Sequence, residues 1–93
     1  MVYVDDMLAP YRGMKMCHML ADTHEELVAM AKRIGVQLKW IQNAGAYNEH
    51  FDICLSKKRM AVKFGAKEIE YGKELAVLLE RKEGRHGLKN TRR

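Results

Sequence analysis

The sequence has a single proline and only two cysteines among its 93 residues. Cys17 and Cys54 are far apart and form no C-x-x-C pair, so we expect reduced thiols and no disulfide framework. No apolar run approaches the length of a membrane-spanning helix, and the opening stretch MVYVDDML has no basic region leading into an apolar one. We therefore expect a cytoplasmic protein that makes no contact with a membrane.

Several catalytic motifs are also missing. The chain contains no Walker loop, no G-x-G-x-x-G, no serine elbow and no H-E-x-x-H. What is present is the composition of an ordinary globular protein, 47% hydrophobic and 31% charged. A chain of this length is large enough for one modest core, so we expect one domain.

The net charge of +5 is concentrated near the C-terminus. From Arg85 onward the chain has four basic residues and no acidic one, which leaves 13 basic and 12 acidic residues over positions 1–84. We interpret residues 1–84 as a single α/β domain and residues 85–93 as a basic, disordered tail.

Short apolar stretches alternate with helical patterns along the domain. Thr23 and Glu26 match a capping box that starts a helix, and Gly35 ends it. Residues 7–14 are interpreted as a loop. Trp40 is expected to lie in the hydrophobic core, on an alternating strand. The expected strands are 2–4, 15–20, 36–42, 50–55 and 66–70. Two further helices are expected, over 57–64, which Ser56 would cap, and over 72–83.

This order of elements predicts a small single-domain α/β sandwich, with three to five short strands covered by about three helices. Parallel and mixed sheets place ligands at the carboxyl ends of their strands. Asp5 closes the first strand and Asp22 follows the second, so both are candidate ligand-binding residues. Each also has a purely structural interpretation, Asp5 in a turn and Asp22 beside the Thr23 cap.

Three segments carry a resemblance to a known family: VYVDDM…AP, CHMLADTHEEL…MAKRIG and HFDICLSKKRMAVKFGA. Together they resemble, over roughly residues 2–70, the bacterial and phage family called domain of unknown function four thousand and thirty-one. The resemblance implies family positions at Asp5, His18, Asp22, Glu26, His50 and Asp52. The chain departs from the family pattern at Val28, where members often have histidine, and at Phe51, where many have tyrosine. The family implies no activity.

His18, His50 and Asp52 are the candidate catalytic residues. Alternation places His50, Asp52 and Cys54 on one face of an extended segment, which His18 joins if its strand lies alongside. A divalent metal is the less favoured interpretation, because structural zinc sites usually contain closely spaced ligand pairs. A metal-free carboxylate–imidazole couple, either Asp52 with His18 or Asp22 with His50, is favoured over it, as a base or as a tie between strands. Cys54 is expected in the core.

A basic turn follows this face. Ser56, Lys57, Lys58 and Arg59 stand at the predicted start of a helix, where backbone amides bind anions and cations oppose the helix dipole. A bound phosphate would turn this unfavourable interaction of the cations with the helix dipole into a favourable one. A solvated basic turn without a ligand also accounts for these residues. His24, in the first turn of the earlier helix, is expected to be solvated.

Three functions remain open from the sequence. We favour a binding module for a phosphate-bearing ligand, a nucleotide or nucleic acid, held by the basic turn. The second is a metal-dependent phosphoesterase or nuclease built on Asp5, Asp22, His50 and Asp52. The third is a phage-type accessory protein that acts through protein contacts and homo-oligomer assembly.

Overall fold

A computed structural model describes the backbone of residues 1–91 and the side chains of residues 1–85. It contains five strands, three α-helices and one 3₁₀ turn, which confirms the predicted α/β fold. In chain order these are β1 (Val2–Val4), β2 (Ala9–Tyr11), β3 (Met14–Ala21), α1 (His24–Ile34), η1 (Leu38–Trp40), β4 (Phe51–Cys54), α2 (Leu55–Lys63), β5 (Lys67–Glu68) and α3 (Lys73–Thr91).

The sheet is mixed and is organised around β3, its longest strand. β1, β2 and β4 each pair with β3 in antiparallel register, and β5 pairs in parallel with β1. The register places His18 opposite Asp52 of β4. The backbone amide of Asp5 donates to the carbonyl of His18, which continues the β1–β3 pairing by one residue beyond β1. Asp5, His18 and Asp52 therefore lie in one row across three strands.

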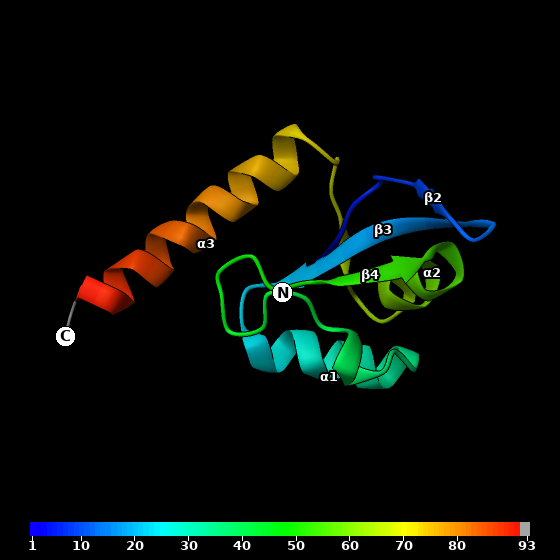
Figure 1. Ribbon diagram of the computed structural model, residues 1–93, viewed down its shortest axis with the longest axis horizontal. Helices are drawn as coiled ribbons and strands as arrows, with labels where there is room; N and C mark the ends of the chain where they lie inside the picture. Colours follow the sequence, from blue (N-terminus) through cyan, green and yellow to red (C-terminus); the bar gives the residue numbers. More distant parts are fainter. Residues whose placement is uncertain (92–93) are drawn as a thin grey trace.

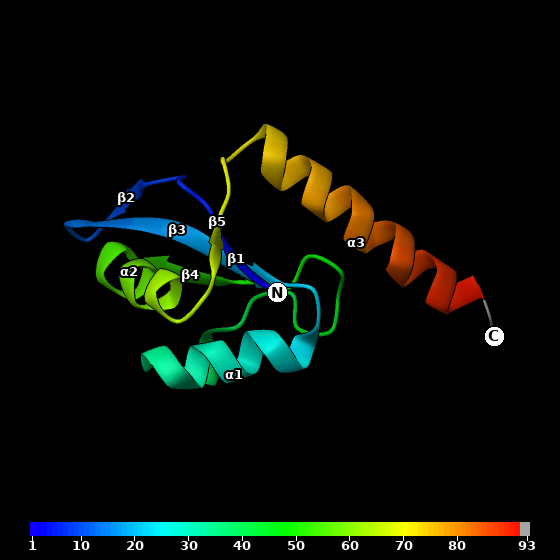
Figure 2. The ribbon, with the colours of Figure 1, turned by 180° about the vertical axis from the view of Figure 1, so that it is seen from behind.

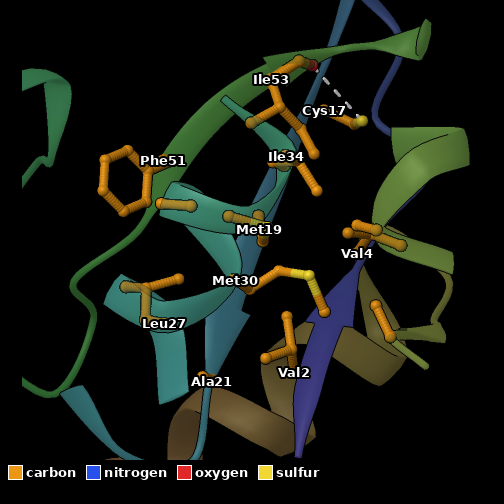
Figure 3. Packing of buried hydrophobic residues seen from close by; sticks show 13 residues of the cluster. Val2, Val4, Cys17, Met19, Ala21, Leu27, Met30, Ile34, Phe51 and Ile53 are labelled. Atoms are coloured by element: carbon orange, nitrogen blue, oxygen red, sulfur yellow. Dashed lines mark hydrogen bonds between the residues drawn. The ribbon is translucent and has the colours of Figure 1, made fainter. Parts of the chain in front are cut away.

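The two faces of the sheet have separate cores. Figures 1 and 2 show α1 and α2 on one side of the sheet and α3 on the other. On the first side, Met19 and Phe51 of the sheet pack with Leu27 and Met30 of α1, as Figure 3 shows. On the second side, Leu20 packs with residues of β1 and α3, including Leu75. Alternation along β3 turns His18 to the same side as Leu20.

The caps of α1 are as predicted. The hydroxyl of Thr23 accepts from the backbone amide of Glu26 at 3.1 Å, and Gly35 ends the helix with φ of +80°. At α2 the prediction was wrong by two residues: Cys54 is the N-cap, and Ser56 lies inside the first turn. Gly65, with φ of +106°, follows α2.

The predicted strand over residues 36–42 is wrong. Residues 38–40 form the 3₁₀ turn, and only Gln42 pairs, in an isolated bridge with His50. Val36 and Ile41 both pack against the first core, and two residues five positions apart cannot lie on one face of a strand. The chain must turn between them, which leaves Trp40 62% exposed rather than in the core.

A strand that the sequence analysis assigned to a loop is β2. It forms a hairpin with β3 through the two-residue turn Arg12-Gly13. Both residues have positive φ, at +48° and +78°, as a type I′ hairpin turn requires. Arginine at the first of these positions hid the turn, because Asn-Gly or Asp-Gly is the usual signal.

α3 is longer than predicted. It continues as helix to Thr91, where the sequence analysis predicted a disordered tail from Arg85. Gly84 is not among the glycines with positive φ, so it does not act as a C-cap. Arg92 and Arg93 of the predicted tail lie outside the described residues. Within the described chain, no helix combines the length and the apolar character that a membrane crossing needs.

Candidate metal centre

His18, His50 and Asp52 converge on the α3 side of the sheet. Their ligand atoms all lie within 4.8 Å of one another. Asp52 Oδ1 is 3.9 Å from His18 Nε2 and 3.7 Å from His50 Nε2, and the two imidazole rings are 5.2 Å apart at an angle of 79°. The predicted grouping of these three side chains is therefore what the strand register produces.

Asp5 fixes the orientation of His18. Its fully buried carboxylate accepts from His18 Nδ1 at 2.6 Å, from the His18 backbone amide at 2.8 Å and from the Met7 amide at 3.3 Å. Burial alone would raise the pKa of Asp5, but these hydrogen bonds lower it below its ordinary value. The same bond to Asp5, opposed by burial, raises the pKa of His18. With its proton on Nδ1, neutral His18 presents an unprotonated Nε2 to the cluster.

His50 and Asp52 are oriented in the same manner. His50 Nδ1 donates to the backbone carbonyl of Asn48 at 2.9 Å, so neutral His50 also presents an unprotonated Nε2. The Gln42 side-chain amide donates to Asp52 Oδ2 at 2.6 Å and leaves Oδ1 facing the two imidazoles. Each of the three side chains thus has one atom held by a neighbour and one lone pair directed into the cluster.

This arrangement could hold a transition-metal ion. Histidine ligands typically donate the other ring N–H to a carboxylate or a backbone carbonyl, and both kinds of partner are present here. A tetrahedral ion at about 2.1 Å from each donor needs donor separations of roughly 3.4 Å. The separations from Asp52 are 3.9 and 3.7 Å, and all three donor atoms lie within 4.8 Å of one another, so side-chain rotations must draw the donors together to reach that geometry. Three protein ligands leave one position for water or substrate.

The cluster is partly open to solvent. The side chains of His18 and His50 are 21% and 17% exposed, and that of Asp52 is 37% exposed. The Tyr71 ring stacks on His18 at 5.8 Å between centroids, and its backbone amide donates to Asp6 Oδ1 at 2.6 Å. An ion and a small substrate can therefore reach the donors without unfolding the sheet.

Asp22 does not join this cluster. It accepts from Tyr3 Oη at 3.2 Å and from Arg81 at 2.7 Å, and it lies 3.5 Å from the N-terminal amine. This network joins α3 to β1 and to the start of α1, which is a structural role. The alternative couple of Asp22 with His50 is not formed, since the ring proton of His50 goes to Asn48.

The basic turn of α2 points its cations at other parts of the protein. Lys57 donates to the carbonyl of Ile34, at the C-terminal end of α1, at 2.8 Å. Lys58 lies 3.6 Å from a carboxylate oxygen of Glu68 in β5. Ser56 lies beside Cys54, and Arg59 is exposed. Lys57 therefore offsets the orphan carbonyls of α1, a role that explains a lysine at this position without a phosphate ligand.

Both cysteines are free, but they differ in environment. Cys17 is buried, and burial raises the pKa of its thiol to about 11. Cys54 is half-buried rather than in the core, and it occupies the N-cap position of α2. The hydrogen bond with the Ser56 hydroxyl, together with backbone amides of the helix start, lowers the pKa of Cys54.

Sequence reasoning missed the groups that support the cluster. Gln42 and Asn48 belong to the loop that joins η1 to β4, and no motif marked them. His24, expected to be solvated, donates to Glu49 of the same loop at 2.8 Å. The one available signal was the β1–β3 pairing, which would have placed Asp5 opposite His18.

Of the comparisons with known proteins, only the one with protein-family models gives a match. Comparison with the curated proteins and with the solved structures gives no significant match. A match to the family described as "Protein of unknown function (DUF4031)" extends over residues 2–82 and includes every residue of the cluster and its supports. The chain therefore belongs to the DUF4031 family.

Proposed function

We propose that this protein binds one divalent transition-metal ion through His18, His50 and Asp52, and that it is a metal-dependent phosphoesterase. The observation that carries the proposal is the direction of the three lone pairs, each set by a hydrogen bond on the far side of its side chain. Imidazole nitrogen with one carboxylate suits zinc, iron or manganese better than magnesium or calcium.

The chemistry follows from the open fourth position. A metal ion held by His18, His50 and Asp52 would lower the pKa of a bound water toward neutrality and polarise a phosphoryl oxygen. In the hydrolysis that this would support, water would give its oxygen to phosphorus and a proton to solvent, and the ester oxygen would leave as an alcohol after taking up a proton. No oxidant or reductant is required.

This proposal is supported better than phosphate binding at the basic turn. Lys57 donates to the carbonyl of Ile34, and Lys58 lies 3.6 Å from a carboxylate oxygen of Glu68. Lys58 and Arg59 line one hollow on α2, but Glu68 lines it too, so the positive charge there is partly offset by a carboxylate of the protein itself. A metal ion supplies the positive charge that a phosphate needs without such a turn. Nucleotides are consequently best tested as substrates of the metal centre.

Metal analysis after equilibrium dialysis against Zn²⁺ or Mn²⁺ tests the site. We expect one ion per chain, and we expect His18→Ala and His50→Ala each to abolish stoichiometric binding. His24→Gln is the matched control: it removes an imidazole outside the cluster, and glutamine can still donate to Glu49. Equal metal content in all four proteins would refute the site.

Hydrolysis is tested separately, with p-nitrophenyl phosphate and bis-p-nitrophenyl phosphate as substrates. We expect turnover that is lost in chelator, restored by the same ion and absent in Asp52→Asn. If the protein binds one metal ion but releases no nitrophenol, the metal site is retained and the phosphoesterase function is refuted.

A further inference from the structure

A small hollow borders the metal cluster on its α3 side. It has a volume of about 120 Å³ and is lined by His18, Leu20, Asn48, His50, Leu75 and Leu79. The two imidazoles form one wall, and three leucines from β3 and α3 form the others. The hollow therefore borders two of the three residues of the cluster, His18 and His50, and its other walls are mostly apolar.

Its size suits a single ring or a short branched alkyl group. An apolar protein cavity of about 150 Å³ holds one benzene molecule. Leu20 and Leu75 are 2% and 9% exposed, so the floor belongs to the packed core under α3 and is held in place. Asn48, whose side-chain amide bonds to no group in the described part of the chain, adds one polar contact at the rim.

No cationic side chain among residues 1–85 lines this hollow. Farther along α3, Arg81 donates to Asp22 and Tyr3, and Lys82 donates to the carbonyl of Ala21. A nucleic-acid strand requires a stripe of lysines and arginines that neutralises several phosphates. The surface beside the cluster offers an apolar notch instead.

We infer that this hollow is the substrate subsite for a small apolar group, so that the metal centre acts on phosphate esters of small aryl or branched alkyl alcohols rather than on nucleic acid. The inference rests on the proposed phosphoesterase function. It assigns the leaving alcohol to the space among Leu20, Leu75 and Leu79 while the phosphoryl group lies at the metal. Substrate choice then depends on the shape of the leucine wall.

Binding of phosphonates to Zn²⁺-loaded protein tests this without turnover. We expect phenylphosphonate to bind about tenfold more tightly than methylphosphonate, the factor that roughly 55 Å² of apolar burial gives at about 25 cal/mol per Å². A short oligothymidylate should bind more weakly than phenylphosphonate. Equal affinity for the two phosphonates, or tight oligonucleotide binding with a steep salt dependence, overturns the inference.

Variants of the leucine wall sharpen the test. Leu79→Phe fills the hollow and should remove the preference for phenylphosphonate while metal content stays at one ion per chain. Val77→Phe adds a ring of the same size two positions away on α3, where Val77 is 60% exposed, and should leave the preference intact. Loss of the preference in both variants, or in neither, contradicts the assignment.

Two further outcomes separate this inference from the function beneath it. If Leu79→Phe does not fold, Leu79→Ala widens the hollow and should improve binding of 1-naphthylphosphonate relative to phenylphosphonate; no gain overturns the subsite. If Zn²⁺-loaded protein hydrolyses aryl phosphates yet binds both phosphonates equally, the subsite is refuted and the phosphoesterase function is retained. If neither phosphonate binds and no ester is cleaved, both the subsite and the phosphoesterase function are refuted.

Discussion

Asp5→Asn isolates the effect of the buried carboxylate on the metal centre. Asparagine has the shape of aspartate and retains one oxygen, which can still accept from the His18 and Met7 backbone amides as Oδ1 does now. Its NH₂ group replaces Oδ2 and would face His18 Nδ1. A donor facing Nδ1 favours the tautomer with its proton on Nε2, which removes the lone pair that His18 offers to the cluster.

The expected loss follows from that single change. Replacing the outer partner of a histidine ligand lowers metal affinity about 10- to 100-fold, or about 1.4–2.7 kcal/mol. Folding stability should fall by at most about 1.5–3 kcal/mol, the contribution of one hydrogen bond to a charged group. Competition with a chromophoric chelator gives the Zn²⁺ affinity, and thermal unfolding of metal-free protein gives the stability.

Asp6→Asn is the control for this measurement. Asp6 is the adjacent aspartate, it is exposed, and it accepts from the Tyr71 backbone amide through an oxygen that asparagine keeps. Its Zn²⁺ affinity should equal that of the unaltered protein. An Asp5→Asn protein that binds Zn²⁺ as tightly as the unaltered protein would show that the orientation of His18 does not depend on Asp5, and the reasoning would fail.

Three other predictions concern stability and thiol chemistry. Gly35→Ala should lower the free energy of unfolding by about 1 kcal/mol or more in a denaturant titration, because alanine is strained at φ of +80°; an unchanged midpoint would contradict the left-handed cap. Iodoacetamide at mildly alkaline pH should modify Cys54 well before Cys17, whose pKa of about 11 and burial protect it, and peptide mapping will show the order. The Glu49 hydrogen bond raises the pKa of His24 above its ordinary value of 6.5. The hydrogen bond should therefore stabilise the fold in full below pH 6.5, and this stabilisation should disappear as the pH rises through the raised pKa. The stability gap between the unaltered protein and His24→Gln should therefore narrow with rising pH, and a gap that widens would refute the bond.

The sequence predicted the elements that local signals specify. The capping box at Thr23 and the left-handed Gly35 mark α1 at both ends, and each acts through atoms only a few positions away. β1 and the α/β class were read in the same way, from branched and aromatic runs and from alternation. These signals are carried by short sequence windows, which is why they were recovered.

Features that depend on pairing between distant segments were not recovered. Whether residues 36–42 formed a strand depended on having a partner, and only Gln42 pairs, with His50. The exposure of Trp40 follows from the same turn. For the cluster, period-two alternation placed His50 and Asp52 on one face. Choosing Asp5 over Asp52 as the hydrogen-bond partner of His18 required the register of β1 on β3, which no local pattern encodes.

The position of the cluster follows from how the second side of the sheet is covered. α3 contributes Leu75 and Leu78 to a small core over Tyr3 and Leu20, and along β3 that core ends at Leu20, two residues from His18. A polar side chain on this side is costly under a helix but is tolerated at the edge of one, where water reaches it. His18, His50 and Asp52 lie at that edge, and each loses part of its hydration but is held in a fixed orientation by a hydrogen bond on its far side. This fixed orientation contributes little to folding stability, because apolar side chains could pack at the same positions. It is, however, what a set of metal ligands requires.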